Sequence, residues 1–502
     1  MSNMAKARNK ELHKIIQSIF QDLEKRYVFF GLGVNAFNRL GPEFFIPHYK
    51  ILSLRNPLEN RLIKKRVSIF SLEKDMQKSH INAPRNSNTL IKHPQTQAYI
   101  ESFENRQPVF LVYKPFLAME KIIQKKKWLL VANPYRFGKK LFENKITFRK
   151  IAQDLNLSVS PGEIVKDPKN ILKNFGKFKE RYGLPLVIQH PARGGGRGTF
   201  FIENQDQFRN ILPNLENNTL ALKFIHGPSP SITGCVTPWG IAYTYPQYQI
   251  LDQPECYNLK TKIGNGLWCG HDWTFSKNKF TKQILDSIYE LVVKIGEYLA
   301  KQKYRGIFGL DFIYDQKSQK IYLVECNPRL LGSFPVLTMV QENNKEIPIL
   351  MLHILSFLQL SKKCDNVMRR IFPEILSTMQ QEKTGAQLVL HNQKKCWARN
   401  QKEIKPGIYC MRNGQLTFIR KGYSLCDLKK KEEFLISDGV PYKSTAFSPN
   451  RRIVRFITLN KVLKNYKKLT PWAHQATQAV YQSLELKPIR FFKIKKFFNN
   501  FL

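Results

Sequence analysis

Two carboxylates and an amide in one short stretch of the chain have the spacing of a metal site. The stretch GIFGLDFIYDQKSQKIYLVECNPRLLGS, residues 306–333, contains Asp311, Glu325 and Asn327. Glu325 and Asn327 are two residues apart in an expected strand, so their side chains project from the same face. If the polar turn at residues 315–319 closes a hairpin, Asp311 falls opposite Glu325 or the residue before it.

These oxygen ligands predict a magnesium site shared with phosphate groups. Like-charged carboxylates in a partly buried place repel each other and resist ionising without a cation. Carboxylate and amide oxygens are hard ligands that suit Mg²⁺ bound jointly to substrate phosphates. Arg329 follows two residues after Asn327 and supplies a cation that can hold a phosphoryl or carboxylate group.

A glycine-rich loop between two short apolar runs is a second candidate. The runs are Pro185–Gln189 and Thr199–Ile202. Between them lie Arg193, Gly194, Gly195, Gly196, Arg197 and Gly198. Apolar residues on both sides predict strand–loop–strand, whereas a Walker P-loop needs a following helix and the pattern GxxxxGK(S/T), which is absent.

Hydrophobic periodicity predicts the elements that position these residues. A helix is expected over Lys145–Leu155, ahead of the loop, and a strongly amphipathic helix over Ile284–Lys301. Strands are expected at Gly306–Tyr314 and Lys320–Glu325. The metal residues would therefore lie on a hairpin, and the glycine-rich loop between two further strands.

The flanking regions predict two further parts. Tyr27–Gly31 is expected to be a buried strand that runs into Gly-Leu-Gly, and Pro108–Tyr113 another strand. A strand followed by GLG resembles the start of a nucleotide-binding α/β layer, and a tight turn explains it equally well, since Ala36 replaces the third glycine of GxGxxG. Residues 385–458 contain short β-branched runs broken by Gly, Pro and Asn, which indicates a small β-rich domain.

Taken together, the motifs resemble those of the ATP-grasp superfamily, which includes D-alanine–D-alanine ligase, biotin carboxylase and carbamoyl-phosphate synthetase. DFIYD followed by IYLVECNPR is similar to its metal-binding signature, and ARGGGRGTFFI is similar to its phosphate-covering loop. The resemblance covers residues 144–341. It implies an ATP-grasp fold in a chain of α/β and α+β class. The expected parts are an N-terminal α/β domain (1–143), the ATP-grasp domain (144–345), a helical connector (346–384), a β-rich C-terminal domain (385–460) and a basic aromatic tail (461–502).

The resemblance also implies a role for each candidate residue around the phosphates. Asp311, Glu325 and Asn327 would hold one or two Mg²⁺ ions, with Mn²⁺ as an alternative, between the phosphates of ATP. The loop from Arg193 to Gly198 would close over the triphosphate, and Arg197 would add charge. Lys145 would reach a phosphate.

The remaining implied roles concern adenine and the reacting group. The hinge formed by Lys223, Phe224 and Ile225 would meet adenine through its backbone, and Arg329 would steady an acyl-phosphate or the tetrahedral species after it. The sequence departs from the family at Gln189, where a lysine is usual, and it lacks the usual acidic residues around the hinge. Gln189 can hydrogen-bond adenine or phosphate but brings no charge.

The activity that the resemblance implies is ATP- and Mg²⁺-dependent ligation of a small-molecule carboxylate to an amine or similar nucleophile through an acyl-phosphate. Gln189 and the altered hinge motivate one alternative, a degenerate ATP-grasp chain that acts as a binding or scaffold protein with weak or no catalysis. A nucleic-acid-binding protein is a third possibility, which only the charge suggests, since no zinc finger or RNA-recognition motif is present.

Composition and charge limit which partners and which cellular location are expected. The 502 residues include 81 Lys and Arg against 38 Asp and Glu, a net charge of +43. The lysines recur along the whole chain, which favours a solvated surface, with ATP as the expected anion and no nucleic-acid partner. No CxxC pair and no apolar run of membrane-spanning length occur, so we predict a cytoplasmic protein. The sequence leaves the oligomeric state open.

The last stretch, KPIRFFKIKKFFNNFL at residues 487–502, is basic and aromatic. On a helix it would gather Phe491, Ile494, Phe498 and Phe501 on one face. Such a face suits peripheral contact with an anionic membrane surface. It equally suits docking onto this protein's own surface or onto a partner, which we favour slightly.

Overall fold

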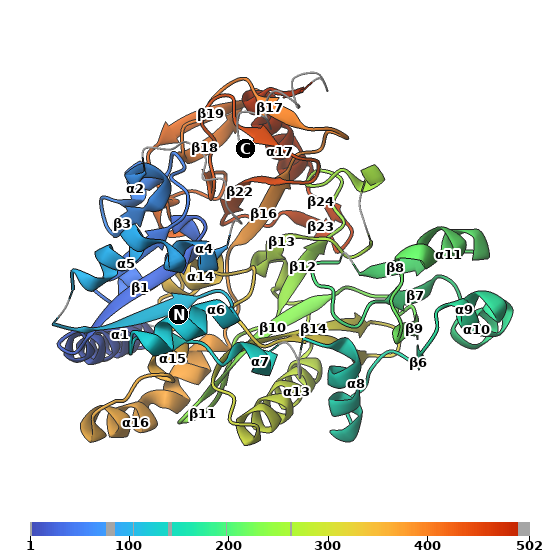
Figure 1. Ribbon diagram of the computed structural model, residues 1–502, viewed down its shortest axis with the longest axis horizontal. Coiled ribbons are helices and arrows are strands. Elements are labelled where there is room, and N and C mark those ends of the chain that lie inside the picture. Colours follow the sequence, from blue (N-terminus) through green and yellow to red (C-terminus); the bar gives the residue numbers. More distant parts are fainter. Residues whose placement is uncertain are drawn as a thin grey trace.

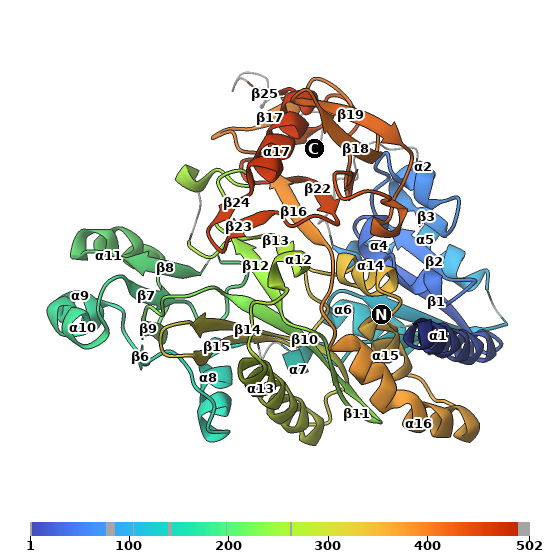
Figure 2. The same ribbon diagram turned by 180° about the vertical axis from the view of Figure 1, so that it is seen from behind.

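The structure is a computed structural model that describes residues 3–76, 86–103, 105–138, 143–196, 198–261 and 264–489. Figure 1 shows three regions around a central sheet: an N-terminal α/β layer (blue), a small protruding lobe (green) and a C-terminal lobe (orange to red). Figure 2 shows the same arrangement from behind. The predicted mixture of α/β and α+β architecture is confirmed.

The N-terminal layer is a parallel five-stranded sheet in the order β3-β2-β1-β4-β5. Its strands are β1 (Tyr27–Gly33), β2 (Lys50–Ser53), β3 (Ser68–Ser71), β4 (Gln107–Val112) and β5 (Leu129–Val131). Its helices are α1 (Asn3–Leu23), α2 (Asn60–Ile63), α3 (Leu72–Asp75), α4 (Ser87–Lys92), α5 (Pro94–Glu101), α6 (Leu117–Lys125) and α7 (Tyr135–Phe137).

Strand β1 is buried along its whole length because helices cover both faces of the sheet. Phe29 packs in the cluster that contains α1, whereas Phe30 packs with residues of α4, α5 and α6. The predicted strand extends through the Gly-Leu-Gly segment, so both glycines belong to β1 and form no loop after it. Gly31 is required by packing, since a Cβ there would lie 2.0 Å from the Tyr49 hydroxyl oxygen.

The small lobe is an antiparallel sheet in the order β6-β9-β7-β8 with three helices on its outer side (Figure 1). Its strands are β6 (Gly162–Val165), β7 (Leu186–Gln189), β8 (Thr199–Ile202) and β9 (Thr219–Lys223). Its helices are α9 (Lys169–Lys173), α10 (Phe175–Tyr182) and α11 (Gln205–Ile211), and α8 (Lys145–Asp154) leads into the lobe. The predicted strand–loop–strand around the glycines is therefore β7–loop–β8.

The central sheet has eleven strands and runs from the hairpin that carries Asp311, Glu325 and Asn327, called the metal hairpin after its predicted role, into the C-terminal lobe. Its first strands are β10 (Pro230–Thr237), β11 (Gly240–Tyr243), β12 (Gln247–Leu251), β13 (Trp268–Asp272), β14 (Gly306–Asp315) and β15 (Lys320–Asn327). Helix α12 (Trp273–Ser276) follows β13, and α13 (Lys282–Lys301) packs on β10 and β11. The predicted stripe of α13, from Ile284 to Leu299, is buried.

The C-terminal strands continue this sheet and do not begin a new one. Strand β16 (Ala386–His391) pairs with β13, and the order continues through β22 (Arg452–Thr458), β20 (Phe434–Ser437), β18 (Gly407–Arg412) and β19 (Gln415–Arg420). Smaller sheets contain β17 (Ala398–Asn400), β21 (Ala446–Phe447), β23 (Leu463–Asn465), β24 (Lys468–Leu469) and β25 (Leu486–Pro488).

Residues 461–489, which the sequence assigns to a tail, are folded into this lobe. Helix α17 (Pro471–Leu484) buries Ala473, Ala476 and Val480 in the core, and β25 pairs with β17. Small apolar residues at helical spacing supply this packing face, which the basic composition of the region obscures. The rest of the predicted tail, from residue 490, lies outside the described residues.

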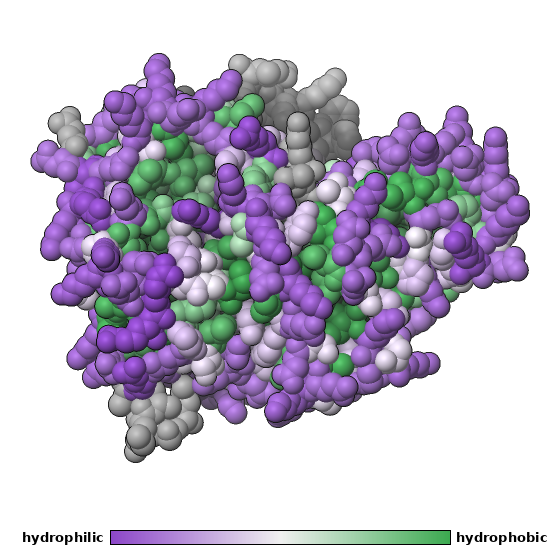
Figure 3. Space-filling model, turned by 90° about the horizontal axis from the view of Figure 1, so that it is seen from below, coloured by the Kyte–Doolittle hydropathy of each residue, from purple (hydrophilic) through white to green (hydrophobic). Residues whose placement is uncertain are grey.

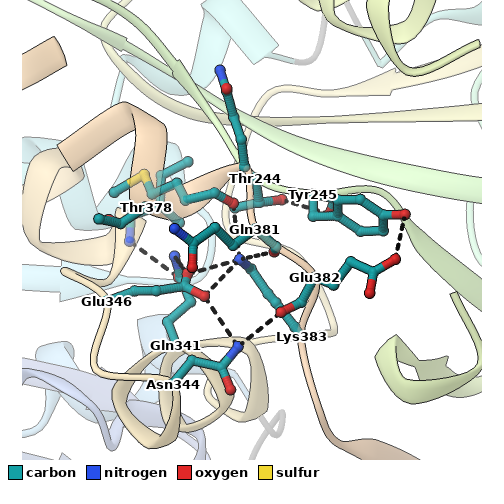
Figure 4. A network of polar contacts seen from close by, with 12 residues as sticks. Thr244, Tyr245, Gln341, Asn344, Glu346, Thr378, Gln381, Glu382 and Lys383 are labelled. Atoms are coloured by element: carbon teal, nitrogen blue, oxygen red, sulfur yellow. Dashed lines mark hydrogen bonds and ion pairs between the residues drawn. The ribbon is translucent and has the colours of Figure 1, made fainter. Parts of the chain in front are cut away.

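A fully buried ion pair fixes the connection between the two halves of the central sheet (Figure 4). Helices α14 (Val336–Asn343), α15 (Ile349–Leu355) and α16 (Lys362–Met379) form this connection. The side chains of Lys383 and Glu346 are 0% and 1% exposed, and Lys383 Nζ lies 2.7 Å from Glu346 Oε2. Lys383 Nζ also donates to the carbonyls of Met379 (2.8 Å) and Gln381 (3.1 Å).

Replacing Lys383 by Met is expected to lower the free energy of unfolding by about 3–5 kcal/mol, because it leaves the Glu346 carboxylate buried without a counter-charge. Urea denaturation measures this loss. Lys363→Met, at an exposed position of α16, is the matched control and should be nearly neutral. An equal, small loss in both variants would show that the ion pair contributes little.

The lower face of the molecule is mostly hydrophilic. Figure 3 shows purple side chains projecting over this face, with green apolar side chains between them. Such a face agrees with lysines spread over a solvated surface. Among the residues that the structure describes, no helix combines the length and the apolar character that a membrane crossing requires.

Candidate active site

The three predicted metal ligands meet at one end of the β14–β15 hairpin. Asp311 pairs with Glu325 in the predicted register, with a bulge directly after Asp311. The Asn327 amide nitrogen donates to Asp311 Oδ2 and to Glu325 Oε1, both at 3.1 Å. Gln249 of β12 donates to Asp311 Oδ1 at 2.8 Å. The structure brings the three side chains together, and their role as metal ligands stays a prediction.

The two carboxylates differ strongly in their affinity for a proton. Burial, together with the neighbouring Glu325, raises the pKa of Asp311 well above its usual value. Burial would raise the pKa of Glu325 as well, but the Lys145 ammonium, 2.9 Å from Glu325 Oε2, lowers that pKa to about 2. Of the two carboxyl groups, Asp311 therefore holds its proton more tightly, and a bound cation would favour release of that proton.

The donor set fits magnesium. In the described part of the chain, no group of three or more His, Cys, Asp or Glu side chains could hold a metal ion. A cation on the hairpin would therefore have two carboxylates and one amide from the protein, and it would need other oxygen ligands. Mg²⁺ binds in this way, because it is commonly held by one or two carboxylates plus phosphates and water.

Lys145 connects the metal hairpin to the glycine-rich loop. It is the first residue of α8, whose N-cap Asn144 accepts from the N–H groups of Ile146 (2.9 Å) and Thr147 (3.2 Å). The Lys145 side chain is 6% exposed, and besides Glu325 it contacts the Arg193 carbonyl oxygen at 3.0 Å. The predicted phosphate-binding lysine thus lies between the two motifs.

The glycine-rich loop is folded against a neighbouring loop. Gly195 and Gly196 have φ angles of +69° and +78°, and a Cβ on Gly196 would lie 2.6 Å from the Gly266 carbonyl oxygen. The guanidinium of Arg193 donates to Glu216 at 2.8 and 3.0 Å, so it is already paired.

The predicted loop residues differ in where they lie. Arg193, Gly195 and Gly196 line a cavity, whereas Gly194 and Gly198 do not. Arg197 lies outside the described residues.

That cavity, of about 560 Å³, separates the small lobe from the central sheet. Its apolar part contains Val187, Leu220, Leu222, Phe201, Ile313 and Leu323, which are contributed by both sheets. The hinge residues Lys223, Phe224 and Ile225 border this part, and Phe224 packs edge-on against Phe201 with 5.0 Å between ring centroids. An apolar slot between two sheets suits a purine base.

Gln189 also lines the cavity, where the resemblance leads one to expect a lysine. The side chain is buried, and its amide nitrogen donates to the Thr199 hydroxyl at 3.2 Å. The position therefore offers a neutral hydrogen-bonding group to a ligand. Lys145 supplies a cation from the other side of the loop.

Arg329 reaches from the hairpin to the N-terminal layer. Its Nη2 donates to Asn327 Oδ1 at 2.8 Å, its Nε donates to Glu143 Oε1 at 3.0 Å, and its Nη1 donates to the Tyr113 hydroxyl. Glu143 also accepts from Lys114 Nζ at 2.9 Å. Arg329 therefore occupies a mixed-charge cluster beside the metal hairpin.

Sequence reasoning missed Tyr113, Lys114, Glu143 and Gln249. For Tyr113 and Lys114 a signal existed, because they directly follow β4 and ligands commonly bind beyond the carboxyl ends of parallel strands. Gln249 and Glu143 carry no such signal. Their contacts with Asp311 and Arg329 join residues 62 and 186 positions apart in the sequence.

Comparison with known proteins identifies one domain. Residues 177–333 match the ATP-grasp domain family. A curated relative, [butirosin acyl-carrier protein]–L-glutamate ligase of Niallia circulans, is 22% identical over 220 residues, which are 43% of this chain and 49% of that enzyme. The chain thus aligns with about half the length of this relative.

Solved structures share the fold over most of the chain. Biotin carboxylase from Campylobacter jejuni, in complex with a nucleotide, has a TM-score of 0.55 at 13% identity and aligns over 88% of this chain and 89% of its own. The biotin carboxylase domain of Hydrogenobacter thermophilus 2-oxoglutarate carboxylase, with MgADP, ADP and bicarbonate, has a TM-score of 0.53 at 13% identity, over 93% and 91%. At this identity the likeness concerns the fold alone.

Proposed function

We propose that this chain, in which residues 177–333 match the ATP-grasp domain family, is an ATP- and Mg²⁺-dependent ligase. It joins a small-molecule carboxylate to an amine or similar nucleophile. One observation carries the proposal: Asp311, Glu325 and Asn327 meet Lys145 at the wall of a cavity large enough for a nucleotide.

The reaction needs an activated carboxyl group, because a carboxylate has no adequate leaving group for attack by an amine near pH 7. Transfer of the γ-phosphoryl group of ATP to a carboxylate oxygen makes an acyl-phosphate, and the nucleophile then displaces phosphate from the acyl carbon. Asp311, Glu325 and Asn327 would hold Mg²⁺, which when bound would supply positive charge for the phosphoryl transfer.

Other residues of the chain bind the nucleotide, orient the substrate and exclude water. The apolar slot and the hinge at residues 223–225 bind adenine, while Lys145 and the backbone N–H groups of the glycine-rich loop hold the triphosphate. Arg329 orients the reacting carboxylate or acyl-phosphate beside the metal hairpin. The folded loop excludes water, which would hydrolyse the intermediate.

An ADP-release screen against pooled amino acids, peptides and other carboxylates and amines tests the proposal, with mass spectrometry of the product. We expect ADP together with a product whose mass is the sum of acid and amine less one water. Saturable MgATP binding with no ADP formed in any pool would contradict a ligase. That result would favour a binding or scaffold chain, for which Gln189 is the supporting observation.

Removal of divalent metal is expected to abolish product formation, because the hairpin carboxylates repel the phosphates of ATP in the absence of a cation. Chelation with EDTA followed by return of Mg²⁺ should restore the rate, and Mn²⁺ should replace Mg²⁺ at least in part. Ligation that continues at its full rate in EDTA would rule out the metal role of the hairpin.

A further inference from the structure

A hairpin from beyond the matched ATP-grasp domain reaches the mouth of the nucleotide cavity. Strands β23 and β24 form this hairpin, and its two tip residues, Tyr466 and Lys467, both line the cavity. The Tyr466 side chain is exposed. Figures 1 and 2 show β23 and β24 on the side of the C-terminal lobe that faces the small lobe.

The base of this hairpin is fixed by a buried carboxylate. Asp272 is fully buried and accepts from the backbone N–H groups of Val462 (2.7 Å) and Leu463 (2.9 Å), as well as from Phe275 (2.7 Å). Leu463 and Leu469, one on each strand, pack in the central core. The position of the hairpin is thus set by the sheet beneath it.

The tip is ordered by hydrogen bonds of its own. Asn465 Oδ1 accepts from the N–H groups of Lys467 and Lys468, both at 2.9 Å. Gln253 donates to the Lys467 carbonyl oxygen at 3.0 Å. Because the backbone is already held, a ligand at the tip would have to order only the side chains, which lowers the entropic cost of binding.

The tip carries unpaired positive charge. Lys467 is exposed, and its ammonium lies 5.5 Å from the centroid of the Tyr466 ring. Among the described residues, it makes no ion pair with a carboxylate, whereas Lys487 pairs with Glu485 at 3.0 Å. A lysine without a counter-ion on the wall of a cavity attracts anions.

Short contacts connect the tip to the glycine-rich loop. Gln253, which holds the Lys467 carbonyl, follows Asp252, and the Asp252 carboxylate accepts from the Gly266 N–H at 2.7 Å. Gly266 in turn is the residue against which Gly196 packs. The hairpin tip and the glycine-rich loop are therefore linked through the Asp252–Gly266 hydrogen bond, and both line the cavity.

We propose that Lys467 and Tyr466 form an anion-binding subsite at the mouth of the cavity. The subsite takes an anionic oxygen group, either the terminal phosphate of the nucleotide or an acidic group of the carboxylate substrate. The lysine supplies charge, and the tyrosine hydroxyl donates a hydrogen bond. This inference rests on the proposed ligase function.

Lys467→Ala tests the subsite, and Lys468→Ala is the matched control, because Lys468 is exposed on the same hairpin but does not line the cavity. Calorimetry gives the affinities for Mg²⁺ with AMP-PNP, a non-hydrolysable ATP analogue, and for MgADP. If the subsite takes the terminal phosphate, Lys467→Ala should weaken AMP-PNP about tenfold and leave ADP unchanged.

If the subsite takes the substrate, both nucleotide affinities stay unchanged, while the KM for the acid found by the ADP-release screen rises about tenfold at an unchanged kcat. An Lys467→Ala variant that matches Lys468→Ala in all three measurements overturns the subsite but leaves the ligase intact. A wild-type chain that binds no nucleotide and forms no product removes the proposed function, and the subsite with it.

Discussion

Asp311→Asn is expected to reduce ATP-dependent product formation about a thousandfold, a loss of ~4 kcal/mol in transition-state stabilisation, while the protein stays folded. The substitution keeps the shape of the side chain but removes the charge that would hold the cation between the phosphates. Folding should not suffer, because the buried carboxylate is already repelled by Glu325. Initial rates of ADP release and a urea denaturation curve measure the two effects.

Asp315→Asn is the matched control for this prediction. Asp315 ends the same strand, but its side chain accepts from Ser318 and Lys317 at an exposed turn. Product formation should therefore be unchanged in this variant. If Asp311→Asn and Glu325→Gln both turn over ATP at the wild-type rate, the hairpin is not the metal site.

Lys145→Met is expected to lower kcat/KM for ATP about a hundredfold, because two contacts disappear together. The ammonium keeps Glu325 ionised at 2.9 Å, and it fixes the glycine-rich loop through the Arg193 carbonyl. The methionine chain fills the same space, so the core around α8 should be retained. Steady-state kinetics at several ATP concentrations measure the loss.

Lys150→Met, at an exposed position of α8, removes an equal charge from the same helix. This control should retain wild-type kcat/KM, which separates a local contact from a general effect of net charge. Equal kinetics in the two variants would contradict a phosphate-binding role for Lys145.

The metal hairpin was predictable because its determinants are local. Alternation fixes the face of Glu325 and Asn327, and a short polar turn narrows the partner of Asp311 to Val324 or Glu325. In the structure the partner is Glu325. The strand–loop–strand around the glycines followed from apolar runs on both sides. Both motifs depend on fewer than about twenty consecutive residues, within the range of pattern arguments.

Contacts between distant parts of the chain could not be read in the same way. The Arg329–Glu143 pair and the Gln249–Asp311 hydrogen bond depend on how separate layers pack. The sequence predicts a tail that includes residues 463–469, because the basic composition of this segment obscures its short apolar pattern. Its position is fixed by Asp272, which lies about 190 residues earlier and follows no local rule.

Transfer of oxygen from the substrate to phosphate tests the ligase mechanism most directly. The acid identified by the ADP-release screen is prepared with ¹⁸O in both carboxylate positions, and the inorganic phosphate released with the product is analysed by mass spectrometry. An acyl-phosphate predicts one ¹⁸O atom in phosphate for each product molecule, because the bridging oxygen leaves with phosphorus. Product formed together with phosphate that carries no ¹⁸O would contradict activation of the carboxylate as an acyl-phosphate.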